Sequence, residues 1–378
     1  MRKRSRAITA AVAACTTAAA LTAVSTPSAS AHESTHGWAH SPKVLNHKVI
    51  APFGLAVSGG DVWYTDGFVG TVNKISKNGS DRVVTRGPGS EVAGIDVIQG
   101  GRTYAFTSSN EDHSATSLTI RTKGRKDVVA DLSKYEKRHN PDHRNTYGVV
   151  AGGKTCAPGQ LDAYFQKNFG VPATYKGHVD SHPYAVAYLG DGAWAVADAG
   201  GNDILRVDRH GHVSTIAVLP PQPVKLSAAQ VAALGAPACL AGATYNFEPV
   251  PTDVERGEHG MLWVSTLPGG PEDPRLGARG SVYTVNPWRH STKRVATGFL
   301  GATNLALGCD GSVYVAELFG NKVTRLKHGH TSTVLKTDRP LSIEVKGSWL
   351  YVGTLADVSF GPGAPVVKAP GSITRYHL

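Results

Sequence analysis

The stretch WAVADAGGNDILRVDRHG (residues 194–211) has the pattern of a strand, a tight polar turn, a second strand and another turn. The stretch VYVAELFGNKVTRLKHG (residues 313–329) has the same order with mostly different residues. Repetition of one pattern along a chain is typical of architectures built from similar units. Hydrophobic positions recur because each unit presents the same apolar strands to its neighbours, whereas turn residues are free to differ.

Six short segments open the repeated units. They are PFGLAV (52–57), VAGIDV (92–97), PYAVAY (183–188), PTDVER (251–256), ATNLAL (302–307) and PLSIEV (340–345). In each unit a Gly-containing turn leads to a second strand, such as VWYTD, and then to a third strand, such as TVNKIS. Five units continue into an outer strand rich in β-branched residues, which suit a pleated, half-buried surface.

The sixth unit has no outer strand after its third strand, and the segment KVLNHKVIA (43–51) precedes the first unit without a partner. We expect this N-terminal strand to complete the last unit, because pairing removes an open sheet edge. The sequence therefore predicts an all-β fold over residues 43–378. The predicted architecture is a six-bladed β-propeller with four antiparallel strands per blade, its ring closed by the N-terminal strand in the last blade.

The starts of successive units lie 40, 91, 68, 51 and 38 residues apart, so several units carry insertions. The longest insertions are residues 133–182 and 220–250, on either side of the third unit. In an up-and-down blade these connections emerge on the same side as the connections between second and third strands. One face therefore carries the long loops, and long loops on a rigid scaffold usually carry binding.

Each long insertion contains one cysteine, Cys156 in the first and Cys239 in the second. We predict a disulfide between them, and we expect Cys309 to be a lone thiol. The second insertion also predicts a short helix with Ser227 as its N-cap. The segment SKYEKRHNPDHRN (133–145) is polar enough to be mobile unless other parts of the chain hold it.

Residues 1–31 have a basic start, an Ala/Thr/Val-rich run and small residues before His32, which predicts a signal peptide and a secreted protein. Residues 32–42 are expected to form a flexible tail. A lipoprotein attachment box ending at Cys15 is the alternative, but too few apolar residues precede that cysteine. Nothing later approaches the ~18 consecutive apolar residues of a membrane span.

The whole chain has a formal net charge of +10, which falls to +6 when the four basic residues of the signal peptide are removed. This charge is too small to indicate a nucleic-acid partner, and it is compatible with adhesion to an anionic cell envelope. We expect the partner to be a small molecule, a peptide or an envelope polymer, and the protein to be a monomer.

The loop LPGGPEDPRLGARG (267–280) is the strongest candidate for ligand binding, because its prolines and glycines give it a defined shape. Its charged residues are Glu272, Asp273, Arg275 and Arg279. These groups could bind a carboxylate or a sugar. The alternative interpretation is that the two arginines form ion pairs with the two acids of the loop. His182 lies on the same predicted face. It could act there as a general base or a ligand, or it could simply form hydrogen bonds within its loop. Neither G-x-S-x-G nor H-E-x-x-H occurs.

Acidic residues end three of the second strands, at Asp66, Asp198 and Glu317. At this position an acid usually accepts backbone N–H groups from the following turn and is less often catalytic. We therefore expect these three side chains to be structural.

Four segments together resemble the ScyD/ScyE family of exported bacterial propellers. They are HPYAVA…VADAGGNDILRVD, EPVPTDVE, STLPGGPEDPRLGARGSVYTVNP and GATNLA…VYVAELFGNKV. The similarity extends over essentially the whole mature chain. It implies a six-bladed fold, and it implies no established catalytic residues.

The repeats are also similar to those of NHL-like and SMP-30/gluconolactonase-like propellers, some of which hold a divalent metal at the channel mouth. The corresponding positions here are Gly54, Gly94, Ala185, Asp253, Asn304 and Ser342. Of these, Asp253 and Asn304 could bind calcium or magnesium through oxygen, with Glu248 and Asp180 nearby. The other interpretation is that Asp253 and Asn304 hydrogen-bond neighbouring loops.

The sequence thus favours a secreted propeller that binds a ligand or partner through its loop-rich face, without a defined catalytic activity. The alternative hypothesis is a metal-assisted lactonase or lyase that acts at the channel mouth through Asp253, Asn304 and His182.

Overall fold

The structure is a computed structural model that describes residues 41–152, 155–271, 274–359 and 366–378. The predicted signal peptide (1–31) and nearly all of the predicted tail (32–42) lie outside the described residues. Glu272 and Asp273 lie outside them as well. Within these ranges no helix has the length and apolar character needed to cross a membrane.

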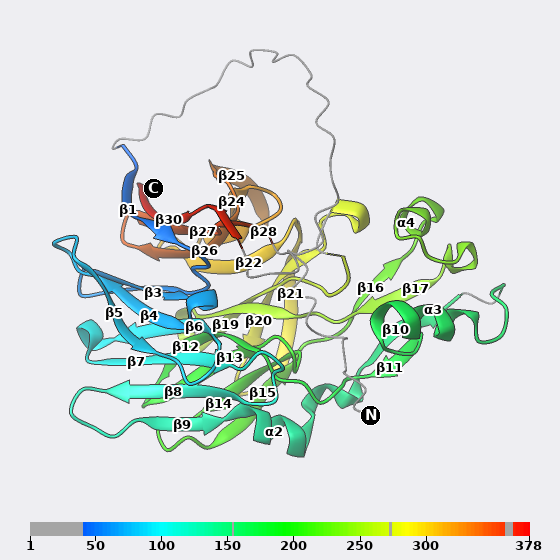
Figure 1. Cartoon of the computed structure of the whole chain (residues 1–378), viewed down its shortest axis with the longest axis horizontal. Helices are drawn as coiled ribbons and strands as arrows, with labels where there is room; N and C mark the ends of the chain where they lie inside the picture. The colour runs from blue at the N-terminus through cyan, green and yellow to red at the C-terminus, as the bar shows by residue number, and fades with distance from the viewer. Residues whose placement is uncertain (1–40, 153–154, 272–273, 360–365) are drawn as a thin grey trace, which may run out of the picture.

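Most of the described chain forms four-stranded antiparallel sheets in which strands follow chain order (Figure 1). The first contains β2 (Leu55–Ser58), β3 (Asp61–Asp66), β4 (Thr71–Ile75) and β5 (Asp81–Arg86). The second contains β6 (Glu91–Ile98), β7 (Thr103–Ser109), β8 (Thr116–Thr122) and β9 (Val128–Asp131).

Three further sheets of the same kind follow the first long insertion. The third contains β12 (Pro183–Gly190), β13 (Ala193–Asp198), β14 (Asp203–Val207) and β15 (Val213–Val218). The fourth contains β18 (Pro251–Arg256), β19 (Leu262–Thr266), β20 (Gly280–Asn286) and β21 (Ser291–Phe299). The fifth contains β22 (Ala302–Leu307), β23 (Val313–Glu317), β24 (Lys322–Lys327) and β25 (His330–Lys336).

The last sheet of this kind takes its outer strand from the other end of the chain. Its members are β26 (Pro340–Lys346), β27 (Trp349–Thr354), β30 (Gly371–His377) and β1 (Lys43–Val49). Asn46 lies opposite Ile373 in the antiparallel pair β1–β30, so the predicted pairing of these two strands is confirmed. Between β27 and β30 the chain forms a small hairpin of β28 (Asp357–Ser359) and β29 (Val366–Ala369).

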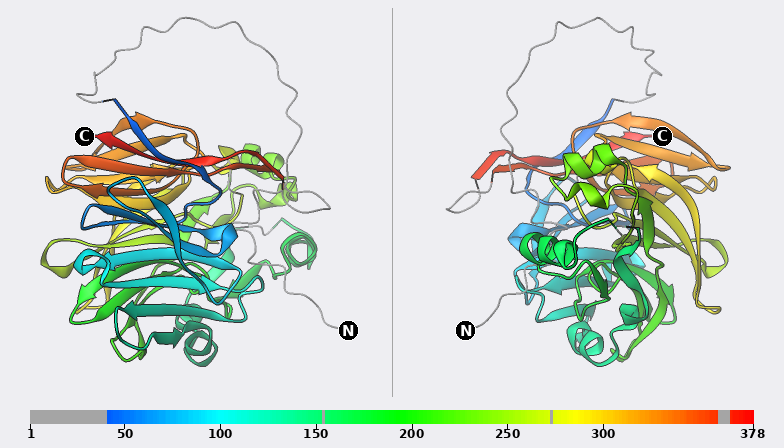
Figure 2. Two further views of the ribbon diagram at one scale, coloured as in Figure 1. Left: turned by 60° about the vertical axis from the view of Figure 1, so that its left-hand side comes forward. Right: turned by 90° about the vertical axis from the view of Figure 1, so that its right-hand side faces the viewer.

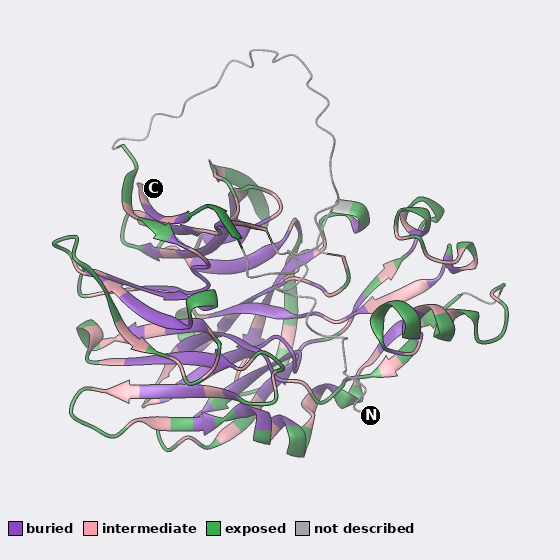
Figure 3. Cartoon of the chain, viewed as in Figure 1, coloured by how far each residue is buried: buried purple, intermediate pink, exposed green. Residues whose placement is uncertain are grey.

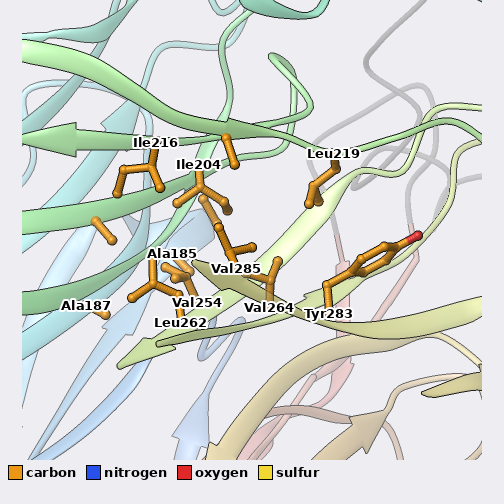
Figure 4. Packing of buried hydrophobic residues seen from close by; sticks show 13 residues of the cluster. Ala185, Ala187, Ile204, Ile216, Leu219, Val254, Leu262, Val264, Tyr283 and Val285 are labelled. Carbon is orange, nitrogen blue, oxygen red and sulfur yellow. The ribbon is translucent and has the colours of Figure 1, made fainter. Parts of the chain in front are cut away.

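The innermost strands contact one another in a cyclic order, β2 to β6, β12, β18, β22, β26 and back to β2. Figure 3 shows that the inner strands are mostly buried. Neighbouring sheets meet through apolar side chains, as between the third and fourth sheets, where Ala185, Ile204, Val254 and Leu262 pack together (Figure 4). The arrangement is that of a β-propeller.

The third residue of each opening segment lies where one inner strand meets the next. A Cβ atom at Gly94 would lie 2.6 Å from the Cα of Ala185, and one at Gly54 would lie 2.8 Å from the carbonyl oxygen of Ala93. At these two positions the close approach of the strands leaves room for glycine alone.

In the later sheets the same position carries a side chain that bonds to the next inner strand. The N–H of Leu305 donates to Oδ2 of Asp253 at 2.8 Å. The N–H of Ile343 donates to Oδ1 of Asn304 at 2.8 Å. Ser342 donates its hydroxyl to the carbonyl of Pro52 at 2.5 Å. These polar contacts and the glycine contacts serve the same purpose, which is to join adjacent sheets.

The two long insertions build one further sheet together, which the sequence did not predict. Its order is β11 (Thr174–Lys176), β10 (Thr146–Ala151), β17 (Thr244–Phe247) and β16 (Gln222–Lys225). Figures 1 and 2 show this insertion sheet to one side of the other sheets, together with α3 (Gln160–Phe169) and α4 (Ala228–Ala233). Phe165, Val231 and Leu240 belong to its apolar core.

The predicted disulfide joins Cys156 to Cys239, and Cys309 is a free, exposed thiol. The predicted helix is α4, and Ser227 is its N-cap. The Ser227 hydroxyl accepts from the N–H of Gln230, while the Gln230 side chain accepts from the N–H of Ser227. The sequence therefore located the crosslink and the helix that lie within the unpredicted sheet.

The polar segment 133–145 is ordered because other parts of the chain hold it. It forms most of α2 (Leu132–His139), whose N-cap Asp131 accepts from the N–H of Lys134 at 2.8 Å. The Tyr135 and Thr215 hydroxyls are hydrogen-bonded at 2.9 Å.

Short 3-10 helices occur in the connections of the described chain. They span Gly67–Val69, Gln99–Gly101, Pro141–Arg144, Ala238–Leu240, Glu258–Gly260 and Pro274–Leu276.

The substitution Gly94→Ala tests the close approach of the inner strands. We expect a loss of about 1 to 3 kcal/mol in the free energy of unfolding, because the new methyl group forces the strands apart. Urea unfolding measures this loss. As a control, Gly79→Ala adds a methyl group at φ +88° with no atom within 4 Å, so its cost is backbone strain alone, about 1 kcal/mol. A Gly94→Ala protein no less stable than the Gly79→Ala protein would contradict the prediction.

The paired substitution Cys156→Ser/Cys239→Ser tests the crosslink of the insertion sheet. The bond joins residues 83 positions apart, and the chain-entropy model assigns such a loop about 4 kcal/mol. We expect amide hydrogen exchange in β10 and β17 to accelerate more than exchange in the other sheets. Cys309→Ser is the control, and it should leave all rates unchanged. Equal protection of β10 in both variants would contradict this expectation.

Candidate functional site

A cavity of about 400 Å³ lies between the insertion sheet and the loop-rich face of the other sheets. One wall comes from α3, α4 and the strands of the insertion sheet. The opposite wall comes from the loops that precede β12 and β18, from the β13–β14 turn and from the β19–β20 loop. The cavity therefore lies on the face for which the sequence predicts long connections.

Aromatic and aliphatic side chains form most of the cavity wall. The aromatic residues are Tyr164, Phe165, Phe169, Tyr175, Tyr245 and Phe247. Phe165 stacks on Tyr245 with ring centroids 5.6 Å apart, and Tyr245 lies 4.5 Å from Phe247. Leu226, Leu240 and Leu276 extend the apolar surface. Such walls suit a ligand with an aromatic or aliphatic body.

Glu248 places a carboxyl group in this apolar wall. The Tyr175 hydroxyl donates to its Oε1 at 2.9 Å, and Nδ2 of Asn202 lies 3.5 Å from its Oε2. Burial raises the pKa of Glu248, and the neighbouring Asp180 carboxylate raises it further. Burial also raises the pKa of Tyr245 to about 12, so that hydroxyl stays protonated.

His182, which the sequence singled out, lines the cavity as part of an ion pair. Its Nε2 lies 2.6 Å from Oε1 of Glu91. Burial alone would lower the pKa of His182, but the Glu91 carboxylate outweighs burial and raises it. The imidazole of His113 stacks on His182 at 4.1 Å, and its Nδ1 lies 3.5 Å from Asp180. His182 is therefore a fixed part of the wall, held by Glu91.

The two arginines of the predicted ligand-binding loop have different positions. Arg275 lines the cavity, and its Nη1 lies 3.5 Å from the carbonyl of Ala233 at the end of α4. Arg279 stacks over the Phe247 ring at 4.4 Å and donates to the carbonyls of Gly269, Pro268 and Pro271. Arg279 thus shapes the loop that carries part of the wall.

Asp253 and Asn304 lie on inner strands and are not among the residues that line the cavity. Their side-chain oxygens already accept the inter-sheet N–H groups described above. Burial raises the pKa of Asp253 to about 7, and the Asp96 carboxylate contributes. Across the described ranges no three His, Cys, Asp or Glu side chains are arranged to hold a metal ion. The residues do not fit a metal in this arrangement, so we derive no metal-dependent step.

The three acids at the ends of second strands have the structural role that the sequence predicts, but most of their N–H donors lie in the segment before the sheet and not in the following turn. Asp66 accepts from Ile50 and Ala51, Asp198 from His182 and Gly201, and Glu317 from Leu300. Each carboxylate thereby holds the segment that enters its own sheet.

The third sheet adds a second acid to this position, and the result is a buried acidic cluster beside the cavity. Asp203 lies directly opposite Asp198, whereas the first, second, fourth and fifth sheets have Thr, Ser or Lys at the position of Asp203. Asp203 is 1% exposed, and among the described residues neither of its carboxyl oxygens has a hydrogen-bond partner. Glu136 of α2 and Asp142 are buried close to it.

Burial and mutual repulsion keep protons on this cluster. Burial raises the pKa of Asp203 well above its ordinary value, and the Asp198 and Glu136 carboxylates add to the effect. The same causes raise the pKa of Glu136 to about 8 and that of Asp142 to about 7. Glu136 and Asp142 were not predicted as site residues, because they lie in a strongly polar segment whose charges are all expected to face solvent. The signal for Asp203 is visible in DAGGND, where one short hairpin has an acid at each end.

The substitution Asp203→Asn tests the protonation of this cluster. The folded pKa values exceed the unfolded ones, so the folded protein binds more protons, and the free energy of unfolding falls as pH rises from about 5 to 8. We expect the Asp203→Asn variant to melt at a higher temperature than wild type at pH 8, with a shallower pH dependence. Glu258→Gln, at an exposed turn, should follow wild type. Destabilisation of Asp203→Asn at pH 8 would show that the carboxylate is ionised and required.

Comparison with known proteins supports the fold. No family model matches the sequence, and no curated protein matches it significantly. Among solved structures, the PQQ-bound aldose sugar dehydrogenase of Streptomyces coelicolor is 15% identical with a TM-score of 0.52, covering 89% of this chain and 98% of that chain. A putative glucose dehydrogenase of Thermus thermophilus is 16% identical with a TM-score of 0.51, covering 89% and 99%.

Virginiamycin B lyase of Staphylococcus aureus is 14% identical with a TM-score of 0.49, covering 89% of this chain and 100% of that chain. At such identities a structural match concerns the fold alone. The resemblance to the ScyD/ScyE family is not confirmed by these comparisons. The chain has the fold of a β-propeller, in company with the two dehydrogenases.

Proposed function

We propose that this protein binds a small, largely apolar molecule in the cavity between the insertion sheet and a closed six-bladed propeller. The sheet formed by β26, β27, β30 and β1 is the blade that closes the ring, and the cyclic contacts of the inner strands support this closure. This proposal agrees with the prediction of a protein that binds through one loop-rich face, and it adds the position of the binding site on that face.

The single observation that carries the proposal is the aromatic cavity itself. Its volume of about 400 Å³ is in the range typical of small-molecule sites. Its walls belong to segments far apart in the chain, which the insertion sheet and the Cys156–Cys239 bond hold together. A cavity built in this way is formed before the ligand arrives, so little conformational entropy is lost on binding.

We also propose that the protein is exported and belongs with the ScyD/ScyE propellers. The Cys156–Cys239 bond supports export, because disulfides persist in oxidising compartments. The cavity supports a binding function, and we assign no reaction to it. The dehydrogenase and lyase activities named for the solved propellers are not transferred to this chain.

Binding of a neutral apolar fluorophore, N-phenyl-1-naphthylamine, tests the proposal. We expect saturable binding to the mature protein, and binding at least about tenfold weaker after Ala236→Phe, which fills the cavity. Ala232→Phe adds the same ring on the exposed side of α4 and serves as the matched control. Fluorescence titration gives the three dissociation constants. No saturable binding, or equal binding by both variants, would contradict the proposal.

A further inference from the structure

Glu248 is a carboxyl group without a cationic partner in the part of the chain that the structure describes. Its hydrogen-bond partners are the neutral donors Tyr175 and Asn202. The basic side chains that share the wall have other contacts: His182 pairs with Glu91, Arg275 reaches the end of α4, and the His178 ring stacks on the Tyr175 ring with centroids 5.3 Å apart. Among the described residues Glu248 is the one acid of the cavity wall, and its hydrogen-bond partners are neutral.

The aromatic rings beside Glu248 add a second attraction for positive charge. Phe247 immediately precedes Glu248, Tyr175 donates to it, and the Tyr245 and Phe247 rings are 4.5 Å apart. The face of an aromatic ring attracts cations through its quadrupole. Arg279 already lies over Phe247 in this way, but the loop carbonyls hold it in place. A second cation, brought by a ligand, would be attracted by the same kind of ring face inside the cavity.

Acidic residues also lie near Glu248. Asn202 contacts both Glu248 and Asp142, and the Asp180 carboxylate acts on Glu248 electrostatically. An anionic ligand group would be repelled there, and a neutral group would leave the carboxyl buried without compensation. A positively charged group compensates the buried acid and satisfies its free hydrogen-bonding capacity.

The geometry points to a ligand that carries an ammonium group on an aromatic or aliphatic body, with the ammonium at Glu248 and the body among the aromatic rings. This inference rests on the proposed function and names the class of its ligand. Burial raises the pKa of Glu248 and a bound cation lowers it, so amine binding releases a proton wherever the carboxyl group is protonated beforehand. Amine binding is therefore tighter at higher pH, as long as the amine itself stays protonated.

Three probes with one apolar body separate charge from shape: 4-phenylbutylamine, 4-phenylbutan-1-ol and 4-phenylbutanoate. Isothermal titration of the mature protein at several pH values, in two buffers of different ionisation enthalpy at each pH, measures affinity and proton release together. We expect the amine to bind about tenfold or more tightly than the alcohol, with net proton release below the raised pKa of Glu248. Glu248→Gln should abolish that preference and the proton release. Glu258→Gln should keep both, since Glu258 is exposed at a turn outside the cavity.

The possible outcomes distinguish this inference from the proposed function. Equal affinity for amine and alcohol, or an amine preference that survives Glu248→Gln, would overturn the choice of ligand and leave the apolar site intact. Tightest binding of the carboxylate would overturn it in favour of an anion held at another group. Retained binding of N-phenyl-1-naphthylamine by Glu248→Gln excludes misfolding as the cause of a lost preference. If neither the fluorophore nor any probe binds to wild type, the proposed function fails with it.

Discussion

The structure depends on how closely each inner strand approaches the next. At Gly94 the neighbouring backbone leaves no room for a side chain, and at Asp253 and Asn304 the side chain bonds directly to the next strand. Both solutions fix the spacing between sheets at the centre, where a small error would be repeated round the whole arrangement. The same constraint explains why Asp253 and Asn304, whose oxygens could in principle bind a metal ion, join neighbouring strands instead. Their oxygens are used by backbone N–H groups that would otherwise be buried without partners.

The repeated sheets could be predicted because each is encoded locally. Opening segment, turn and second strand lie within about fifteen residues, so the alternation of apolar residues is visible in the sequence. The pairing of β1 with β30 could also be predicted, because a strand without a partner and a sheet without an outer strand appear in the same chain. The cysteines and the capping residue Ser227 gave equally local signals.

The insertion sheet could not be predicted in the same way. Its strands are short, and β10 pairs with β17 across about 100 residues, as with Gly148 and Asn246. No local pattern predicts such a pairing, because Val149, the residue paired with Tyr245, lies in a different insertion. Half of the cavity wall was therefore missed, including Tyr164, Phe165 and Phe169. The sequence did identify His182, the last residue of the first insertion, and Arg275, in a loop of the fourth unit. It placed Glu248 at the channel mouth instead of in this wall.

The turn between β13 and β14 connects the cavity to the acidic cluster. Asn202 in this turn donates to Asp142, lies near Glu248 and accepts the N–H of Val250. Glu136 and Asp142 come from the first insertion, whereas Glu248 and Val250 come from the second. Protonation of the cluster and occupation of the cavity therefore act on the same hairpin, so a change in one alters the electrostatic environment of the other.

The sheet that contains both β1 and β30 has a consequence for the order in which the protein can fold. The strand β1 (Lys43–Val49) is synthesised before the other strands of its sheet, and its partner β30 (Gly371–His377) emerges after all of them. β1 therefore remains unpaired until β30 has been made, which makes completion of this sheet a late, long-range event. Once the sheet has formed, β1 cannot detach without exposing the edge of β30.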